Sequence, residues 1–543
     1  MLKTIFHNTG EILQRPFREH LIFLIAFFVL ATSPFFIKYI NASNYHYSSI
    51  LIIQCAAISY CVTLLVGLIP HQAIRRTVQT VLIVLSSAFF ILNIYCLFEL
   101  HSLVDADYIM LIMGTNVNEA REFASQLIPI DIVLGITGVL SILGCMGLIA
   151  RRHPMRMGKK WSIAAAGVAL LCMMWSIHTW RAWKDGPVGH LSDILTTFNE
   201  YEMPDESQLH HEVPEIALDE TQELPTSVVL IIGESFARFH SSLYGYEKST
   251  NPCLEDLHDK SLLYTIDSID APAPITNISL QYMMTSFSKA DAEGKDNKWY
   301  EFPSVMEMMS ACGYDCYWFS NQARTGRFNY IARVFAESCK KCFFYQQEGA
   351  LNNNSNLDVV LADSSRQFIR QLEIHNKRHF IVYHMMGSHF DYSKRYTREF
   401  NRFSQSDYAQ YPQNQRKILA SYDNSILYND YIVSQIIDIY KNEEAVIVYV
   451  PDHGQDMFRS SPDYYSHGKM NDPKSFDYGV EIPFMIYASP AFQQKHPQVM
   501  QRIKYRQDHP KAWNSDDLPY LIMDLIGVKT IGGEDVKSKS VLN

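Results

Sequence analysis

Five long apolar stretches dominate the first third of the chain. They span residues 21–37, 49–70, 77–98, 132–150 and 161–180, and none of them contains Asp, Glu, Lys or Arg. Four reach the roughly 18 residues that a helix needs to cross a bilayer, and the first is slightly shorter. A signal peptide would give a single shorter run, and five buried core helices of this length would be unusual. The pattern therefore predicts an α-helical, five-span membrane domain over residues 1–182.

Positively charged side chains lie mainly on one side of these predicted spans. Ten Lys and Arg residues lie before the first stretch, after the second or after the fourth, whereas the opposite loops carry only Lys38 and Arg121. Positively charged short loops stay in the cytoplasm. We therefore expect a cytoplasmic N-terminus and an external location for everything after the fifth stretch, although Arg181 and Lys184 argue mildly against it.

Two connecting segments are amphipathic. The loop 99–129 combines an apolar run with Thr115 and Glu119, which fits a helix in the outer leaflet. Residues 183–225 are rich in proline and acidic residues and form a predicted linker. Within the linker, four apolar residues keep helical spacing, which fits either a helix on the membrane surface or one packed on the next domain. They are Leu191, Ile194, Leu195 and Phe198.

From Thr226 onward, short β-rich apolar runs alternate with longer mixed segments. The clearest runs are 227–232, 316–319, 380–383 and 445–450, and 484–487 is a fifth. This alternation predicts an α/β domain with a mostly parallel central sheet over residues 226–543.

Polar side chains follow four of these predicted strands. In open α/β sheets, sites form where the carboxyl ends of parallel strands meet. A lone Asp-His pair would usually be a surface loop, but several such turns together favour a metal site. Mixed carboxylate and imidazole ligands favour zinc, with manganese as the alternative. The candidate ligands are Glu234, Asp452, His453, His389 and His467.

A site of this kind needs a nucleophile, and metal coordination activates hydroxyl groups. The candidates are Ser235, Thr276 and Ser279. Thr276 follows a proline-rich approach to a predicted helix start, where free backbone N–H groups can hold a phosphate. A plain helix cap explains the same residue, and spacing does not choose among the three hydroxyls.

Several motifs occur in a fixed order, and together they resemble the membrane phosphoethanolamine transferases of the alkaline-phosphatase/sulfatase superfamily. They are Gly233-Glu234-Ser235, Thr276 with Ser279, Gly387-Ser388-His389, the run from Tyr422 to Asp430, and Pro451-Asp452-His453-Gly454. The setting of Thr276 and the run 115–119 are most similar to the branch that modifies lipopolysaccharide core. The resemblance extends over nearly the whole chain and implies a bacterial inner-membrane protein with a periplasmic catalytic domain.

The resemblance also implies roles for individual residues. Zinc would be bound by Glu234, Thr276, Asp452 and His453. Thr276 would attack the phosphorus of phosphatidylethanolamine, a histidine would protonate the departing diacylglycerol, and an acceptor on lipopolysaccharide core or lipid A would then take the group from phospho-threonine. His389 and His467 would bind a second metal or the phosphate, and His384 and Asn321 would contact the ethanolamine phosphate. His384 and His389 would act in catalysis. Thr115 and Glu119 would contact the lipid headgroup. A lysine that relatives place shortly after Asn321 is missing, and Arg324 or Arg327 would replace it.

Two rival functions remain. A phosphoglycerol transferase would have the same metal ligands, whereas a sulfatase would need a modifiable residue in a C/S-x-P-x-R context, which is absent around Ser235 and Thr276. A catalytically silent membrane protein that binds lipid or a partner is the alternative of another class, and absence of zinc from the folded protein would favour it.

Cysteines and overall charge add two expectations. Five of the ten cysteines lie in the apolar stretches and fit small packing residues. The external location favours disulfides among the other five, with the pairing left open. These five are Cys253, Cys312, Cys316, Cys339 and Cys342. The formal net charge of −10 argues against nucleic acid as a partner.

Overall fold

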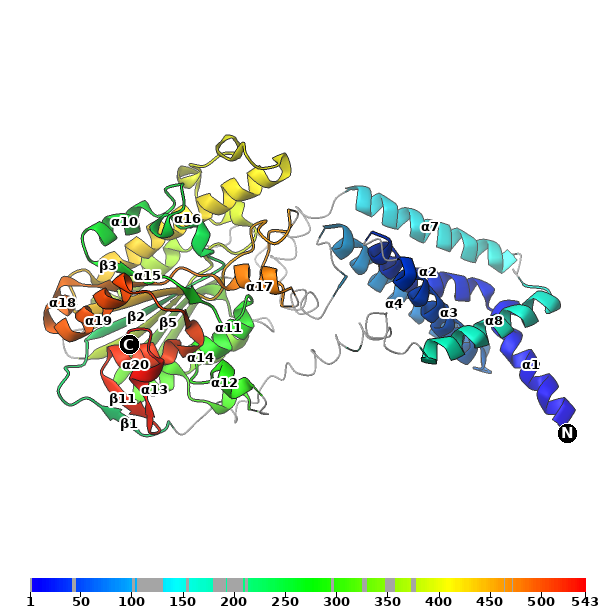
Figure 1. The fold of residues 1–543 in the computed structure, drawn as a ribbon, viewed down its shortest axis with the longest axis horizontal. Coiled ribbons are helices and arrows are strands. Elements are labelled where there is room, and N and C mark those ends of the chain that lie inside the picture. Colours follow the sequence, from blue (N-terminus) through cyan, green and yellow to red (C-terminus); the bar gives the residue numbers. More distant parts are fainter. Residues whose placement is uncertain are drawn as a thin grey trace. The chain divides into compact units, whose positions relative to one another are not determined.

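The chain folds into two compact units, one helical and one α/β, and the α/β unit includes Met203–Asn543. Figure 1 shows both units in a computed structural model. The model describes residues 2–41, 45–99, 103–104, 130–152, 156–178, 192, 209, 213–293, 297–324, 330–346, 357–372, 377–462, 464–470 and 472–543. The predicted lipid-facing residues Thr115 and Glu119 and most of the predicted linker lie outside these ranges.

The helical unit is built around α3. Helix α2 packs against α3 and α4, and α8 packs against α3 and α1. Tyr60 of α3 donates a hydrogen bond to the carbonyl of Leu13 in α1 (2.9 Å), and Ser162 of α8 donates to Gln14 (3.0 Å). The helices of this unit are α1 (Leu2–Arg18), α2 (Leu21–Asn41), α3 (Tyr45–Gly67), α4 (Gln72–Glu99), α7 (Ile130–Arg152) and α8 (Lys159–His178).

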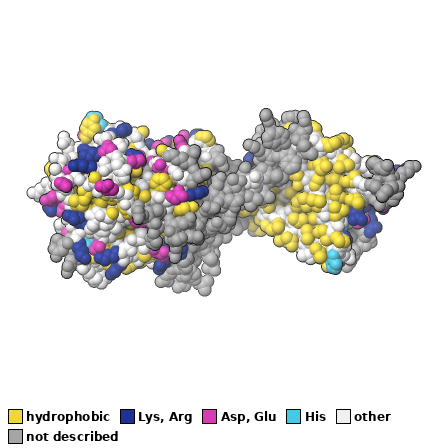
Figure 2. Space-filling view, turned by 90° about the horizontal axis from the view of Figure 1, so that it is seen from below, with side chains coloured by type: hydrophobic (Ala, Val, Ile, Leu, Met, Phe, Trp, Pro, Cys, Tyr) yellow, Lys and Arg dark blue, Asp and Glu magenta, His cyan; other side chains and the backbone are white. Residues whose placement is uncertain are grey.

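Among the described residues, three helices are long and apolar enough to cross a membrane. These spans are Leu21–Lys38, Ile50–Gly67 and Gln72–Phe98. The five predicted stretches are helical over most of their described residues, but the count of five spans is not confirmed, because three helices meet the criterion among the described residues. In Figure 2 the described surface of this unit is largely hydrophobic, whereas the α/β unit shows charges of both signs.

A seven-stranded sheet forms the centre of the α/β unit. Its order is β3-β9-β8-β2-β7-β5-β6, and β2 pairs in parallel with β7 on one side and β8 on the other. Every residue of β2 is buried, which explains its unbroken apolar run. The strands are β2 (Ser227–Gly233), β3 (Leu263–Thr265), β5 (Tyr314–Ala323), β6 (Lys341–Gln346), β7 (Arg378–His384), β8 (Ala445–Pro451) and β9 (Met485–Ala488).

The prediction of a mostly parallel sheet needs a correction, because the sheet is mixed. Strand β9, predicted as the run 484–487, lies antiparallel to both β8 and β3. The short strands β3 and β6 were not predicted. Two small sheets accompany the main one, and they consist of β1 (Ile216–Leu218), β11 (Val528–Ile531) and β12 (Glu534–Asp535), and of β4 (Ile269–Asp270) and β10 (Trp513–Asn514). Strand β1 lies inside the predicted linker.

Helices cover both faces of the main sheet (Figure 1). Val228, Leu230 and Ile232 of β2 belong to a core cluster shared with α11, α13, α14 and α20. Val229 and Ile231 face the other side and pack with α10, α15 and α16. The helices are α10 (Pro252–Asp259), α11 (Thr276–Met283), α12 (Lys289–Ala292), α13 (Val305–Ala311), α14 (Tyr330–Glu337), α15 (Val359–Gln371), α16 (Gln413–Tyr440), α17 (Pro473–Val480), α18 (Pro490–Lys495), α19 (Pro497–Asp508), α20 (Leu518–Leu525) and α21 (Val536–Lys539).

All ten cysteines have free thiols in this structure. The disulfides predicted from the external location are therefore not confirmed. Burial raises the pKa of the Cys316 thiol to about 12, which makes it an unreactive packing group in its reduced form.

Candidate metal centre and nucleophile

Strand register brings the main acidic residues together. Gly233, the last residue of β2, lies opposite Pro451, the last residue of β8. Glu234 and Asp452 follow directly and therefore leave the sheet side by side. Two backbone hydrogen bonds fix the turns to each other: Asp452 N donates to the carbonyl of Gly233 (3.0 Å), and Phe236 N donates to the carbonyl of His453 (3.0 Å).

A cluster of ligand-type atoms forms at this edge. One side-chain atom each of Glu234, His453 and His467 lies within 4.8 Å of the others. His453 Nε2 is 3.2 Å from Glu234 Oε1 and 3.7 Å from Asp452 Oδ2. Glu234, Asp452 and His453 are at most 1% exposed. The structure thus joins four of the five predicted metal ligands.

The cluster fits a divalent cation. Asp452 Oδ2 and His453 Nε2 are buried and make no hydrogen bond within the described chain. Buried polar atoms are nearly always paired, and buried carboxylates need a positive partner. A cation bound by these oxygen and nitrogen atoms would satisfy both at once. This donor set is of the kind that zinc takes in proteins.

The electrostatics of the cluster point the same way. Burial, together with the charge of Glu234, raises the pKa of Asp452 to about 8. Burial alone would lower the pKa of His453, but the carboxylates of Asp452 and Glu234 outweigh it and raise that pKa to about 9. Burial alone would raise the pKa of Glu234, but the neighbouring His453 and His389 hold it well below its usual range. The buried carboxylates thus favour positive charge between them, which a bound divalent cation would supply.

Of the three candidate hydroxyls, Thr276 has the geometry of a nucleophile. It is the first residue of α11 and is half-buried, so a substrate can reach it. Its Oγ1 lies 3.3 Å from Glu234 Oε2. Ser235 and Ser279 are fully buried. Their hydroxyls donate to Glu234 Oε1 and to the carbonyl of Asp452, respectively.

The predicted histidines surround this cluster. The His467 ring lies 4.6 Å from the His453 ring, measured between centroids, and half-buried His389 follows the turn after β7. Burial and the charge of His453 lower the pKa of His467 to about 3. His384 is buried, and burial lowers its pKa to about 4. Its Nδ1 pairs with Ser320 Oγ (3.2 Å), while its Nε2 has no hydrogen-bond partner within the described chain.

Asn321, for which a contact with the ethanolamine phosphate is predicted, pairs with a buried acid. Its side chain is completely buried, and its Nδ2 donates to Asp358 Oδ1 (2.8 Å). Asp358 also accepts from the backbone N–H groups of Met386 (2.9 Å) and Gly387 (2.8 Å). The pair therefore fixes the turn that carries His389.

Sequence reasoning missed Gln322 and Asp358. Gln322 Nε2 lies 3.5 Å from Glu234 Oε2 and donates to the carbonyl of Met385 (3.0 Å). Its position beside Asn321 at a strand end was a usable signal, since adjacent strand residues point to opposite sides. Asp358 lies directly before α15 and follows no predicted strand, so nothing in the local sequence indicated that it would reach the site.

Gly387 shows how tightly these turns pack. Its φ is +49°, and a Cβ at this position would lie 2.7 Å from the carbonyl oxygen of Glu234. Only glycine satisfies both the backbone conformation and the close approach.

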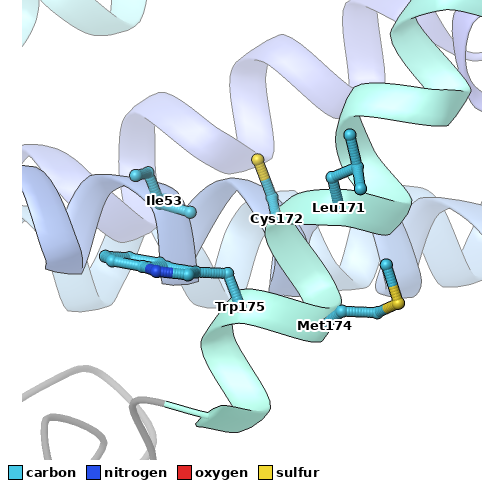
Figure 3. A pocket seen from close by; sticks show the side chains of 5 residues that line it. All are labelled: Ile53, Leu171, Cys172, Met174 and Trp175. Carbon is cyan, nitrogen blue, oxygen red and sulfur yellow. The ribbon is translucent and has the colours of Figure 1, made fainter.

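A pocket in the helical unit carries none of this chemistry. It has a volume of about 640 Å³ and is lined by Ile53, Leu171, Cys172, Met174 and Trp175. Figure 3 shows these apolar side chains on helices of the membrane-type unit.

Relatives of this chain are phosphoethanolamine transferases. EptC of Escherichia coli is 26% identical over 451 residues, which cover 78% of this chain and 75% of that protein. The crystal structure of its C-terminal periplasmic domain in complex with Zn matches with a TM-score of 0.54 at 26% identity and covers 61% of this chain and 90% of that one. The Kdo(2)-lipid A phosphoethanolamine 7''-transferase of Escherichia coli is 25% identical over 272 residues, which are 49% of this chain and 44% of that protein.

A membrane protein shares the fold of the whole chain. The integral membrane protein lipooligosaccharide phosphoethanolamine transferase A of Neisseria meningitidis matches with a TM-score of 0.64 at 17% identity, over 94% of this chain and 96% of that one. A family model described as Sulfatase matches residues 226–528, which is more than half of the 543 residues. The chain therefore belongs to the sulfatase family, with a membrane-type helical unit ahead of the sulfatase-like α/β unit.

Proposed function

We propose that this chain is a membrane phosphoethanolamine transferase that acts on an envelope glycolipid. The observation that carries the proposal is the reach of the half-buried Thr276 hydroxyl to the Glu234 carboxylate (3.3 Å), beside His453 and His467. The order of motifs and the named relatives support the same activity. The acceptor that we propose is lipopolysaccharide core or lipid A, and one relative is named for lipid A.

The reaction has two displacements at phosphorus. Thr276 Oγ1 attacks the phosphorus of phosphatidylethanolamine, and the bond to Thr276 forms as the bond to diacylglycerol breaks. The departing oxygen takes a proton from a histidine, for which His384 and His389 are the candidates, and the proton lost by the Thr276 hydroxyl replaces it. An acceptor hydroxyl of the glycolipid then attacks the same phosphorus, and its proton passes to Thr276, which leaves as a hydroxyl. Asn321 and Gln322 support the turns around this path.

The residues that would hold a metal ion are Glu234, Thr276, Asp452 and His453, with His467 and His389 beside them for a second ion or the phosphate. A bound divalent cation lowers the pKa of a hydroxyl and neutralises charge on the transferred group. We propose zinc, because the donor set suits it and the periplasmic domain of EptC from Escherichia coli has been crystallised with Zn.

We further propose the topology that the Lys and Arg distribution favours. The N-terminus would be cytoplasmic, residues 1–182 would cross the inner membrane five times, and residues 226–543 would form the periplasmic catalytic domain. Membrane lipids would then surround the helical unit, and Thr115 and Glu119 would face the donor headgroup.

The test is to trap the phospho-threonine. We expect the purified full chain, given phosphatidylethanolamine without an acceptor, to gain one phosphoethanolamine group on Thr276, detected by peptide mass spectrometry. Thr276→Ala should lose both the adduct and glycolipid modification. Thr285→Ala is the matched control, since Thr285 lies just beyond the other end of α11 and hydrogen-bonds to the carbonyl of Gln281.

Two results would contradict the proposal. One is full activity in Thr276→Ala. The other is labelling with a phosphoglycerol group from phosphatidylglycerol but not from phosphatidylethanolamine, which would establish the phosphoglycerol transferase instead.

A further inference from the structure

Helix α16 buries an unusual number of polar side chains. It lies against the face of the sheet that also holds α10 and α15. Several of its buried polar side chains hydrogen-bond to other elements of the α/β unit. Asn424 accepts from the backbone of Arg402 and Phe403, Asn429 donates to Tyr449, and Asp430 accepts from the first turn of α10. Polar residues of the run from Tyr422 to Asp430 thus link α16 to other elements, while Ile426 and Tyr428 of the same run belong to the core.

Tyr422 reaches the turn that carries Glu234. Its hydroxyl donates to the carbonyl of Ser235 (2.7 Å) and accepts from the N–H of Ala237 (2.9 Å). Tyr422 is 0% exposed. One hydroxyl therefore forms hydrogen bonds with both ends of the three-residue segment that follows Glu234.

This segment needs an external support. Ser235 has a φ of +56°, a left-handed conformation that residues other than glycine adopt rarely. Such conformations persist where the surroundings over-determine them, and they cluster at functional sites. Other hydrogen bonds at the turn come from Phe236 N to the carbonyl of His453, from Ser235 Oγ to Glu234, from Ser235 N to Asp452 (3.4 Å) and from Ser388 N to the carbonyl of Glu234 (3.0 Å). Tyr422 adds a support from helix α16.

Asp423 anchors the continuation of the same loop. Its Oδ1 pairs with His240 Nδ1 (2.5 Å), and its Oδ2 accepts from Tyr246 (2.7 Å) and from Tyr408. The His240 ring also stacks edge-on against Tyr422, with 5.0 Å between ring centroids. Ser425, further along α16, contacts the turn after β7: its Oγ donates to Ser388 Oγ (2.9 Å), one residue before His389.

We propose that Tyr422 is a positioning residue of the metal centre: its hydroxyl holds the Ser235 turn so that Glu234 faces His453 and Thr276. This inference rests on the proposed function as far as zinc is concerned, but the hold on the turn is a property of the chain alone. Replacing a residue that orients a metal ligand typically lowers metal affinity 10- to 100-fold.

Tyr422→Phe tests the inference, because it keeps the ring and removes only the hydroxyl. In the full chain, we expect zinc affinity, measured by competition with a chromophoric chelator, to fall about 10- to 100-fold. In the metal-free protein, we expect backbone amide exchange over residues 234–240 to become roughly tenfold faster, because Ala237 N loses its acceptor.

Tyr440→Phe is the matched control. Tyr440 lies on the same helix, is fully buried, and shares a hydrogen bond with the hydroxyl of Tyr383 (2.9 Å). It should lose stability like Tyr422→Phe, yet keep wild-type zinc affinity and wild-type exchange over residues 234–240.

Each outcome decides the matter. Unchanged zinc affinity in Tyr422→Phe overturns the inference, even if exchange is faster, and so does an equal loss of affinity in Tyr440→Phe. If the wild-type protein binds no zinc, the proposed function fails, and the exchange rates alone then decide whether Tyr422 holds the turn.

Discussion

The helical unit and the α/β unit satisfy their buried polar side chains in different ways. In the apolar helices of the helical unit, hydroxyls can bond within their own helix: Thr63 Oγ1 donates to the carbonyl of Ser59, and Ser33 Oγ donates to that of Val29, both at 2.7 Å. Tyr60 and Ser162 instead reach α1. In the α/β unit, the hydroxyl of Tyr422 pairs with Ser235, 187 residues away in sequence. Partners within one helix are thus available to hydroxyls of the helical unit, whereas the turn after Glu234 depends on a partner far away in the sequence.

The difference follows from the two environments. A helix in a bilayer must satisfy its backbone polar groups within the segment, and Ser and Thr can bond to the carbonyl four residues earlier. Each such helix is therefore close to complete on its own. The candidate metal centre is complete only when β2, β8, α11 and the loop of His467 are assembled, because its candidate ligands follow or lie on these separate elements.

Glu234→Gln should have the largest effect. It keeps the shape of the side chain but removes the charge that faces His453. We expect transfer to fall by roughly 10³-fold, the loss typical of a strong electrostatic group in an active site. Zinc at 100 times its Kd should stabilise the wild-type protein by about 2.7 kcal/mol and this variant by much less. Thermal unfolding with and without zinc measures the difference.

Asp524→Asn is the control for that comparison. Asp524 is also buried, but it pairs with Arg502 (2.6 Å) and Ser540 (2.6 Å), outside the cluster. It should lower the free energy of unfolding and leave the zinc effect intact. If Glu234→Gln keeps the full zinc effect, the assignment of Glu234 as a ligand is wrong.

Gly479→Ala should give the next largest loss of activity and stability, and Gly167→Ala is its counterpart in the helical unit. A Cβ at Gly479 would lie 2.5 Å from Gly468 Cα and 2.7 Å from Pro274 Cβ, so Gly479→Ala should push the His467 turn away from the Thr276 turn. Overpacking of this kind costs about 1–3 kcal/mol of stability. We also expect roughly a 10²-fold loss of activity, as for a 1 Å misplacement of reacting groups.

Gly167→Ala makes the same change in α8 of the helical unit, where a Cβ would meet nothing within 4 Å. It should be neutral or stabilise the helix by up to about 1 kcal/mol. Calorimetry would measure the stability of both variants, and transfer assays would measure their activity. Similar losses in both variants would contradict the difference between the units.

Thr63→Ala should have the smallest effect. The hydroxyl bonds only to its own helix, and hydrogen bonds of side chains in membrane helices average about 0.6 kcal/mol. Unfolding in mixed micelles would measure the change. A loss well above about 1.7 kcal/mol, the largest value found for such bonds, would mean that Thr63 has a partner in another helix.

Much of the fold could be predicted from local patterns. The apolar stretches gave helices, and the runs 227–232, 316–319, 380–383 and 445–450 correspond to β2, β5, β7 and β8. Strand β6 was not predicted because it is half-buried along most of its length, and β3 was not predicted because it is three residues long. The direction of β9 was not predictable, since an apolar run looks the same in a parallel and an antiparallel pair.

The candidate site followed the same division. Glu234, Asp452 and His453 stand directly after central strands, so their meeting at one edge could be expected. Burial distinguishes the half-buried Thr276 from the buried Ser235 and Ser279, which spacing could not do. The roles of all the site residues stay predictions, and Thr115 and Glu119 lie outside the described residues.

The sequence by itself determined the apolar helices, the buried strands and the set of side chains with metal and phosphoryl chemistry, because periodicity and residue type are local properties. Only the tertiary structure decided that β9 runs against its neighbours, that Asn321 pairs with Asp358, and that Tyr422 holds the turn after Glu234. These outcomes depend on contacts between residues far apart in the chain, and such contacts form only when the whole α/β unit packs.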